Sequence, residues 1–160
     1  MASTEGRQRT ASGDKRGVQE FDLDSFLKKL LRKGFKLFPP YTECLKAAKE
    51  GYWGTNVNGN AQWRVRFTCA VCGRKFNEYT TINRVKYKNI EIDHKTPISS
   101  ADGIADFIAK LFCSLSNLQV LCSYRLSRIA EFGGVPSCHT QKTRAEAAAR
   151  KEARDHAKLP

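Results

Sequence analysis

The chain has 160 residues, a mass of 18.0 kDa and a formal net charge of +12, from 28 Lys and Arg against 16 Asp and Glu. This length fits one modest domain with tails, because two separate cores would each be too small to offset the entropy of ordering the chain. With 41% hydrophobic residues, the sequence has enough apolar material for a core, which excludes a fully disordered protein. The basic excess, with a pI near 9.6, favours a polyanionic partner, and nucleic acid is the leading expectation.

The sequence shows neither a membrane-spanning pattern nor a secretion signal. No apolar run approaches the ~18 residues that cross a bilayer, and the first residues lack the apolar stretch of a signal peptide. We therefore expect a cytoplasmic protein with no membrane partner. Because reducing compartments keep thiols free, the six cysteines are expected to bind metal or pack in the core rather than form disulfides.

The N-terminal part of the chain divides into a polar leader and a helix. Residues 1–20 are polar and lack apolar periodicity, as expected of a disordered leader. Between Phe21 and Phe35, apolar residues recur at helical spacing with basic residues between them, which predicts an amphipathic helix. Pro39 and Pro40 are expected to stop this helix.

The next segment is predicted to contain a short helix, a connection and a strand. A helix is expected at 41–50, with Gly51 ending it. Residues 51–62 are rich in Gly and Asn, which predicts an exposed connection. Residues 62–68 alternate between polar and apolar side chains, which predicts a strand.

The second half of the chain contains two further predicted strands and two further helices. Ser99 followed by Asp102 resembles a capping box, in front of a helix with an apolar face from Ile104 to Leu111. The remaining expected elements are strands at 89–93 and 118–122 and a helix at 144–157 that is rich in Ala, Arg, Lys and Glu.

Cysteine, histidine, acidic and amide residues gather in short motifs. These are CAVC at 69–72, EIDHKTP at 91–97, NLQVLC at 117–122 and CHTQKT at 138–143. Each alone is ambiguous: a CxxC pair can be half a zinc site, a redox pair or chance, and Asp93-His94 can be a turn with a structural histidine. Together they supply the parts of a phosphodiester hydrolase, namely a base for water and ligands for a divalent metal.

In combination, these motifs resemble the HNH endonucleases, specifically the short free-standing forms encoded by tailed bacteriophages. The resemblance rests on FTCAVCGRKF, EIDHKTPIS, LFCSLSNLQVLC and CHTQKTRAE in that order, and FLKKLLRKGFKLFPPYTECLKAAKE extends it towards the N-terminus. It implies an α+β fold with a small ββα-metal core of the His-Me finger type, held by a structural zinc site. N-terminal helices and a C-terminal helix would flank this core.

The resemblance also implies a division of the chain. We expect a disordered leader at 1–20, an N-terminal helical region at 21–55, a nuclease domain at 56–147 with an inserted loop at 123–137, and a C-terminal helical tail at 148–160.

The resemblance assigns roles to four polar residues. It implies that His94 is the general base, that Asp93 and His139 ligate a catalytic divalent ion, and that Asn117 holds the loop that positions the base. The ion would be Mg²⁺, with Mn²⁺ or Ni²⁺ as alternatives. Duplex DNA is the expected partner, bound mainly through its phosphates. The basic residues expected to contact it are Lys142, Arg64, Arg66 and Lys95.

The same resemblance implies a structural zinc site formed by Cys69, Cys72, Cys122 and Cys138. The sequence departs from the family pattern here, because residues 123–137 separate Cys122 from Cys138. A loop that returns at Gly133, Gly134 and Pro136 would leave both thiolates in place. Otherwise the insertion displaces Cys138 together with His139, or Cys113 supplies the fourth ligand.

Other functions compatible with the motifs are a noncatalytic, zinc-stabilised DNA-binding module and a CxxC redox protein. The redox function has little support, because no thioredoxin-like pattern surrounds Cys69. Outside the motifs, Cys44 is expected to be a buried hydrophobic residue. Trp53 and Trp63 can either stack on bases or pack in the core or a turn.

Overall fold

The computed structural model describes residues 22–125 and 128–157, so the expected leader at 1–20 lies outside the described residues. Within the described residues the fold is α+β, as expected, with four α-helices and three small antiparallel sheets. None of the helices in these ranges has both the length and the apolar character needed to span a bilayer.

The predicted amphipathic helix is confirmed as α1, Leu23–Gly34. Its first turn is capped by Asp22, whose carboxylate accepts a hydrogen bond from the Ser25 N–H at 3.0 Å. Asp24 in the first turn and Arg32 in the last turn complement the helix dipole.

The two prolines do not stop α1, and that prediction was wrong. The helix ends at Gly34, and a 3₁₀ turn at Phe35–Leu37 follows. Pro39 and Pro40 instead form the first turn of α2, Pro39–Ala48, where a fixed φ and a missing N–H cost nothing. Cys44 of α2 is buried in the core, as predicted.

The predicted connection at 51–62 was also wrong, because most of it forms a β-hairpin. Strand β1, Lys49–Thr55, pairs antiparallel with β2, Ala61–Thr68, and β2 also pairs with the short β3, Lys75–Phe76. Gly51 does not end α2 but lies within β1.

Two local features explain why a sequence rich in Gly and Asn forms this hairpin. Gly51 lies under the Trp63 indole, where any Cβ would overlap the ring. At the turn, the Asn56 side chain accepts hydrogen bonds from the N–H groups of Asn58 and Asn60, both at 2.9 Å. The unusual composition therefore marks one close packing contact and one tight turn.

A second hairpin was not expected from the sequence. Strands β4, Tyr79–Ile82, and β5, Val85–Lys88, are joined by Asn83 and Arg84, both at positive φ. Such two-residue turns usually contain Gly, and its absence here hid the hairpin.

The central sheet matches the prediction closely. Strand β6, Ile90–His94, pairs antiparallel with β7, Leu118–Cys122, so that Ile90 lies opposite Cys122 and His94 opposite Leu118. Side chains of this sheet form the centre of the core, where Ile90, Leu121 and Cys122 are almost completely inaccessible.

Helix α3, Gly103–Leu111, follows β6, but the predicted capping box was wrong. Ser99 lies in a separate 3₁₀ turn at Ile98–Ser100, and the Asp102 N–H donates to Asp106 Oδ2 at 2.8 Å. Phe107 and Leu111 of α3 are buried in the core.

Helix α4, Cys138–His156, begins earlier than predicted. The buried Ser137 caps it by accepting from the Thr140 N–H at 3.3 Å. The helix continues across the expected boundary between the nuclease domain and the C-terminal tail, at 147/148. In the same way, the β1–β2 hairpin spans the expected boundary at 55/56 between the N-terminal region and the nuclease domain.

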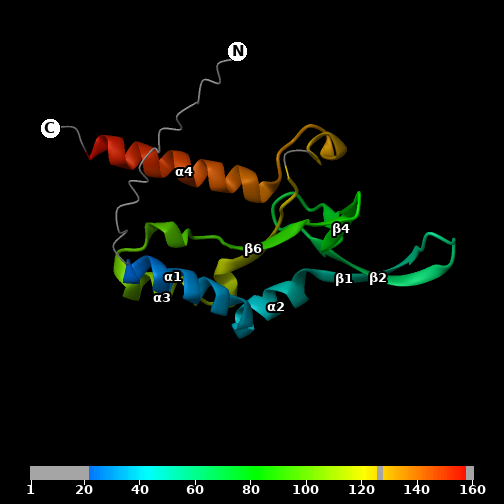
Figure 1. The fold of residues 1–160 in the computed structure, drawn as a ribbon, viewed down its shortest axis with the longest axis horizontal. Helices are drawn as coiled ribbons and strands as arrows, with labels where there is room; N and C mark the ends of the chain where they lie inside the picture. Colours follow the sequence, from blue (N-terminus) through cyan, green and yellow to red (C-terminus); the bar gives the residue numbers. More distant parts are fainter. Residues whose placement is uncertain (1–21, 126–127, 158–160) are drawn as a thin grey trace, which may run out of the picture.

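Figure 1 shows how these elements surround the central sheet. Helix α4 lies on one side of β6 and β7, and α1, α2 and α3 lie on the other. The β1–β2 hairpin projects from one end of the molecule. The central sheet therefore lies between α4 and the other helices, and its two ends carry the candidate sites.

Candidate functional site

Four cysteines from three parts of the chain meet beside the central sheet. Their Sγ atoms all lie within 4.8 Å of one another, and they form the one group of three or more candidate metal ligands among the described residues. Tetrahedral zinc with Zn–S bonds of about 2.3 Å needs sulfur atoms separated by roughly 3.8 Å, so small shifts would close the site. The four can hold a structural metal ion such as zinc. They are Cys69, Cys72, Cys122 and Cys138.

Backbone hydrogen bonds join the two halves of this cluster. The Ala70 N–H donates to the Val120 carbonyl at 2.9 Å, which fixes the turn after β2 to β7. Two further N–H groups point at sulfur: that of Cys122 at Cys69 Sγ, 3.4 Å, and that of Cys138 at Cys122 Sγ, 3.2 Å. Donors of this kind stabilise thiolates, the form that binds metal.

The pKa values of the thiols shift in opposite directions. A hydrogen bond from the Cys122 thiol, assisted by backbone N–H groups, lowers the pKa of Cys69 to about 4. The same hydrogen bond raises the pKa of Cys122, and burial adds to the increase. Burial also raises the pKa of Cys138 to about 11. Several neighbouring thiolates therefore need a cation to coexist.

The inserted loop at 123–137 returns the chain to this cluster because it is anchored at several points. Buried Arg128 donates to Asn89 Oδ1 at 2.5 Å. The Tyr124 and Phe132 rings stack at 4.1 Å, and Arg74 Nη1 donates to the Phe132 carbonyl at 3.0 Å. Cys138 therefore joins the cluster, and Cys113 is not among its members.

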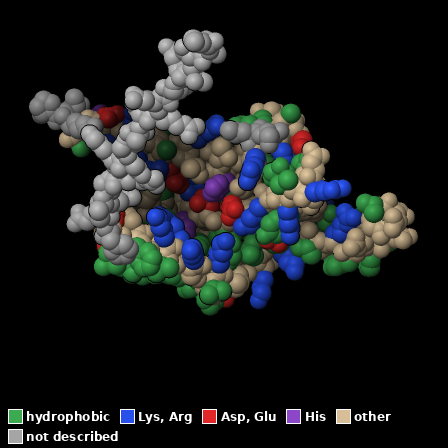
Figure 2. Space-filling model, viewed as in Figure 1, with side chains coloured by type: hydrophobic (Ala, Val, Ile, Leu, Met, Phe, Trp, Pro, Cys, Tyr) green, Lys and Arg blue, Asp and Glu red, His purple; other side chains and the backbone are tan. Residues whose placement is uncertain are grey.

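Asp93 and His94 end β6 at a pocket of about 230 Å³ between α1, α3 and α4. We call this pocket the hollow. Figure 2 shows acidic and histidine side chains gathered in a depression of this face, with Lys and Arg side chains around it. Among the residues that line the hollow are Arg32, Phe35, Asp93, His94, Lys142 and Glu146.

His94 is held tightly, with 6% of its surface exposed. Its Nε2 lies 2.9 Å from the Leu111 carbonyl, and its ring packs 5.0 Å from the Phe35 ring. A carbonyl oxygen only accepts, so Nε2 carries the proton of this hydrogen bond. In the neutral imidazole, Nδ1 is then the free proton acceptor.

Asp93 contacts a lysine from α4. Lys142 Nζ lies 2.8 Å from Asp93 Oδ2, forms a second ion pair with Glu146 and donates to the His94 carbonyl at 2.7 Å. Asp93 Oδ2 is buried, and its partner among the described residues is this lysine. Burial would lower the pKa of Lys142, but both carboxylates outweigh it and raise that pKa.

Glu146 was not anticipated from the sequence. His139, Lys142 and Glu146 follow one another at intervals of three and four residues on α4, which places them on one helical face. That spacing was the available signal, but the expected start of the helix at 144 concealed it.

Asn117 ties down the residues that follow His94. Its Oδ1 accepts from the Thr96 N–H at 2.9 Å, and its carbonyl accepts from the Lys95 N–H at 2.7 Å. The Lys95 ammonium donates to the Ser116 carbonyl at 2.6 Å. Asn117 and Lys95 thus both belong to the junction between β6 and the segment before β7.

The other expected site residues lie elsewhere. His139 is half-buried in the first turn of α4, next to Cys138, and its pairing with Asp93 around one ion stays a prediction. Arg64 and Arg66 lie on β2, and Arg66 pairs with Glu50 at 3.0 Å.

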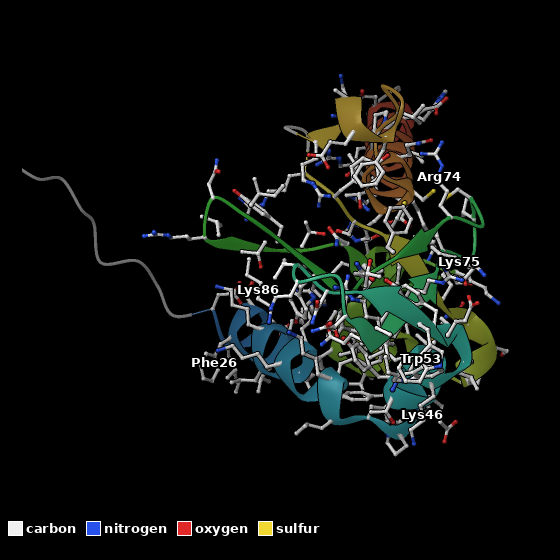
Figure 3. All side chains as sticks on the ribbon, turned by 90° about the vertical axis from the view of Figure 1, so that its right-hand side faces the viewer. Phe26, Lys46, Trp53, Arg74, Lys75 and Lys86 are labelled. Carbon is white, nitrogen blue, oxygen red and sulfur yellow. The ribbon has the colours of Figure 1, made fainter. Side chains whose placement is uncertain are left out.

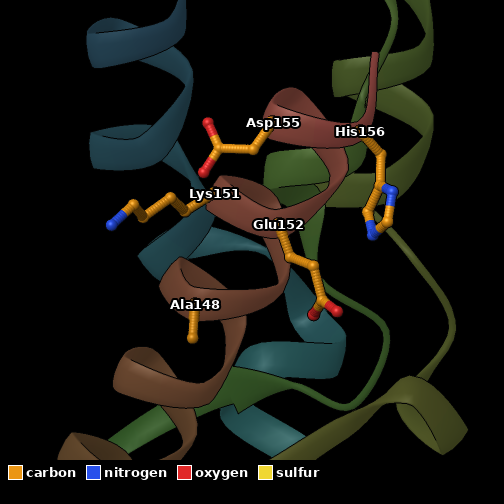
Figure 4. Close-up of a pocket in the computed structure, with 5 residues that line it drawn as sticks. All are labelled: Ala148, Lys151, Glu152, Asp155 and His156. Carbon is orange, nitrogen blue, oxygen red and sulfur yellow. The ribbon is translucent and has the colours of Figure 1, made fainter. Parts of the chain in front are cut away.

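A larger depression, of about 420 Å³, lies along the C-terminal part of α4 (Figure 4). The residues that line it are Ala148, Lys151, Glu152, Asp155 and His156, all from one helix. His156 is exposed. Neither the four cysteines nor Asp93 and His94 line this depression.

Comparison with known proteins adds no assignment. No protein-family model matches the chain, and neither a curated protein nor a solved structure matches it.

Proposed function

We propose that this protein is a metal-dependent DNA endonuclease of the HNH class that hydrolyses phosphodiester bonds. The observation that carries the proposal is the placement of a histidine, with one ring nitrogen free in its neutral form, next to an aspartate with a buried carboxylate oxygen. Both end one strand at a hollow whose surroundings are rich in Lys and Arg (Figure 2).

His94 is the general base in this proposal. The Leu111 carbonyl holds the Nε2 proton, so Nδ1 can take a proton from water, and the same carbonyl stabilises the resulting imidazolium. The Phe35 ring fixes the imidazole plane. Asn117 supports the base indirectly, by holding the backbone of residues 95 and 96.

The hollow contains oxygen donors of the kind that a hard divalent ion prefers. Asp93 and Glu146 line it, and the Lys142 ammonium lies against both carboxylates. In this proposal Asp93 and His139 would hold the ion, although His139 is not among the residues that line the hollow, and Glu146 would be a further oxygen donor on α4. Mg²⁺ or Mn²⁺ bound there would neutralise the phosphate and stabilise the leaving oxygen.

The four cysteines are assigned to structural zinc. A set of four thiolates fills the tetrahedral coordination of zinc and leaves no position for water or substrate. The ion would join the turn after β2 to the end of β7 and the start of α4.

Duplex DNA is the proposed substrate. The chain carries 28 basic against 16 acidic residues, and Arg32 lines the hollow itself. Contacts of this kind bind the phosphate backbone and position an enzyme without reading much sequence.

A plasmid nicking assay with Mg²⁺, Mn²⁺ or Ni²⁺ tests the proposal. Wild-type protein is expected to nick or cut supercoiled DNA, and His94→Ala to lose about 10²–10⁴-fold in rate, the usual contribution of a general base. His156→Ala, which alters an exposed histidine at the end of α4 that does not line the hollow, is the matched control and should retain full activity. Equal cleavage by wild type and a folded His94→Ala variant would contradict the assigned base.

A noncatalytic DNA-binding module is the second candidate. It is favoured by Lys142, whose ammonium already pairs with both Asp93 and Glu146. If this internal cation is permanent, no divalent ion enters the hollow. This candidate predicts salt-sensitive DNA binding without turnover in any metal.

A further inference from the structure

The projecting β1–β2 hairpin, residues 49–68, carries both tryptophans of the chain. We call it the hairpin arm. Trp53 and Trp63 lie directly opposite each other on the paired strands, with ring centroids 5.4 Å apart at an interplanar angle of 72°. They are 70% and 56% exposed. Packing in the core therefore does not explain why two of the largest apolar side chains in the protein are present on this hairpin.

The fold holds these rings in place. Gly51 leaves room for the Trp63 indole against the strand, and the Asn56 side chain fixes the turn at the tip. At the base of the arm, Glu50 forms ion pairs with Arg66 at 3.0 Å and with Lys75 of β3 at 2.6 Å. The two rings are thus presented on a braced ribbon.

Charge around the rings favours one kind of partner. Residues 49–68 contain one acidic side chain, Glu50, against three basic ones, Lys49, Arg64 and Arg66. Glu50 is already shared by Arg66 and Lys75. In Figure 3, which looks at the end from which the arm projects, Lys46 and Lys75 appear below and above Trp53, and Lys75 pairs with Glu50 at the base of the arm. A purely apolar protein surface would leave these cations desolvated, whereas a nucleic acid supplies phosphates for them and flat bases for the indoles.

We propose that the hairpin arm binds unpaired bases of single-stranded nucleic acid, with Trp53 and Trp63 stacking on bases while Lys49, on the same face of the ribbon, contacts phosphates. Aromatic stacking of this kind tolerates any base sequence. The arm is separate from the hollow, and the inference goes beyond the endonuclease proposal because it requires no hydrolysis.

Intrinsic fluorescence reports on the arm alone, because the chain contains only these two tryptophans. The metal-loaded full-length protein is titrated with oligo(dT) of about 20 nucleotides, longer than typical single-strand sites of ~4–16 nucleotides. Stacking should quench the emission and protect it from acrylamide. Heparin, which carries charge but no bases, should do neither.

A double variant, Trp53→Ala with Trp63→Ala, tests affinity by anisotropy of labelled oligo(dT). Its affinity should fall about tenfold or more, the scale of losing stacked bases. Tyr79→Ala is the matched control: Tyr79 is an exposed aromatic residue 4.1 Å from the Lys86 ammonium, but it lies on β4 and should not matter.

Unchanged affinity of the folded double variant, equal quenching by heparin, or no acrylamide protection at saturating oligo(dT) would overturn the proposal. The acrylamide measurement uses wild-type protein, so it decides the matter even if the double variant does not fold. Plasmid cleavage is assayed separately, so loss of the endonuclease proposal and loss of this one are distinguishable.

Discussion

The four-cysteine cluster and the hollow lie at opposite ends of the same two-stranded sheet, yet their charges are balanced differently. Cys122 ends β7 opposite Ile90, whereas His94 ends β6 opposite Leu118. In the cluster, the sulfur atoms lie close to one another and accept hydrogen bonds from backbone N–H groups of the described residues. In the hollow, Asp93 and Glu146 already have the Lys142 ammonium as a shared counter-ion.

This difference indicates two kinds of dependence on metal. Bringing four sulfur ligands together without a cation leaves their charges uncompensated, so the fold around the cluster should require its ion. The hollow supplies its own cation, so the fold there should survive without metal, and a divalent ion would have to compete with Lys142. The predictions below test this contrast.

The largest expected effect is loss of the cluster. Cys122→Ser with Cys138→Ser should reduce bound zinc from about one per chain to almost none and abolish cooperative unfolding, because structural zinc sites contribute about 10–16 kcal/mol in small domains. Elemental analysis and thermal denaturation measure both effects.

Cys113→Ser is the control for this variant, because Cys113 is half-buried but outside the cluster. It should leave the zinc content unchanged. Zinc-free wild type purified without chelator, or unchanged zinc in the double variant, would reject the four-cysteine assignment.

A smaller effect is expected where the inserted loop is anchored. Arg128→Ala removes the donor to buried Asn89 Oδ1 and leaves that oxygen unpaired, which should cost about 2–3 kcal/mol of unfolding free energy. Loss of the anchor should also speed transfer of zinc to a chelator, since the loop delivers Cys138.

Arg125→Ala is the comparison for Arg128, because Arg125 is exposed and lies over the Tyr87 ring at 5.4 Å. It should change stability by less than about 0.5 kcal/mol. If both arginine variants behave alike in chemical denaturation, the buried Arg128 contact does not hold the loop.

The smallest expected effect concerns the internal cation of the hollow. Lys142→Met should lower the unfolding free energy by about 1–2 kcal/mol, because Asp93 and Glu146 lose their counter-ion while remaining partly solvated. Mn²⁺ should replace the missing positive charge and recover the lost stability. The increase in melting temperature on adding Mn²⁺ should therefore be larger for the variant than for wild type.

The exposed residue Lys151 provides the control, since Lys151→Met alters the same helix away from the hollow. It should show the wild-type response to Mn²⁺. An equal response of Lys142→Met and wild type would mean that the ion and Lys142 do not compete.

Local patterns predicted the elements whose apolar residues follow a clear run or period. The short apolar run at 118–122 matches β7, and the helical spacing before Phe35 matches α1. Prediction failed where the same residue type is compatible with two different local structures. Pro39 and Pro40 can end one helix or begin the next, and Gly51 can end a helix or lie under an indole; in both cases tertiary neighbours decide.

The sequence by itself determined most of the residue types of both sites: a CxxC pair with two further cysteines, an Asp-His step at a strand end, and His139 and Lys142 downstream. Only the tertiary structure decided which of them meet. Residues 123–137 separate Cys122 from Cys138, and nothing local shows that Arg128 and stacked aromatic rings bring the chain back. Likewise, the free nitrogen of His94 follows from a carbonyl of α3, and the cation against Asp93 comes from α4. Such contacts depend on how elements pack across long sequence separations, which a local pattern does not contain.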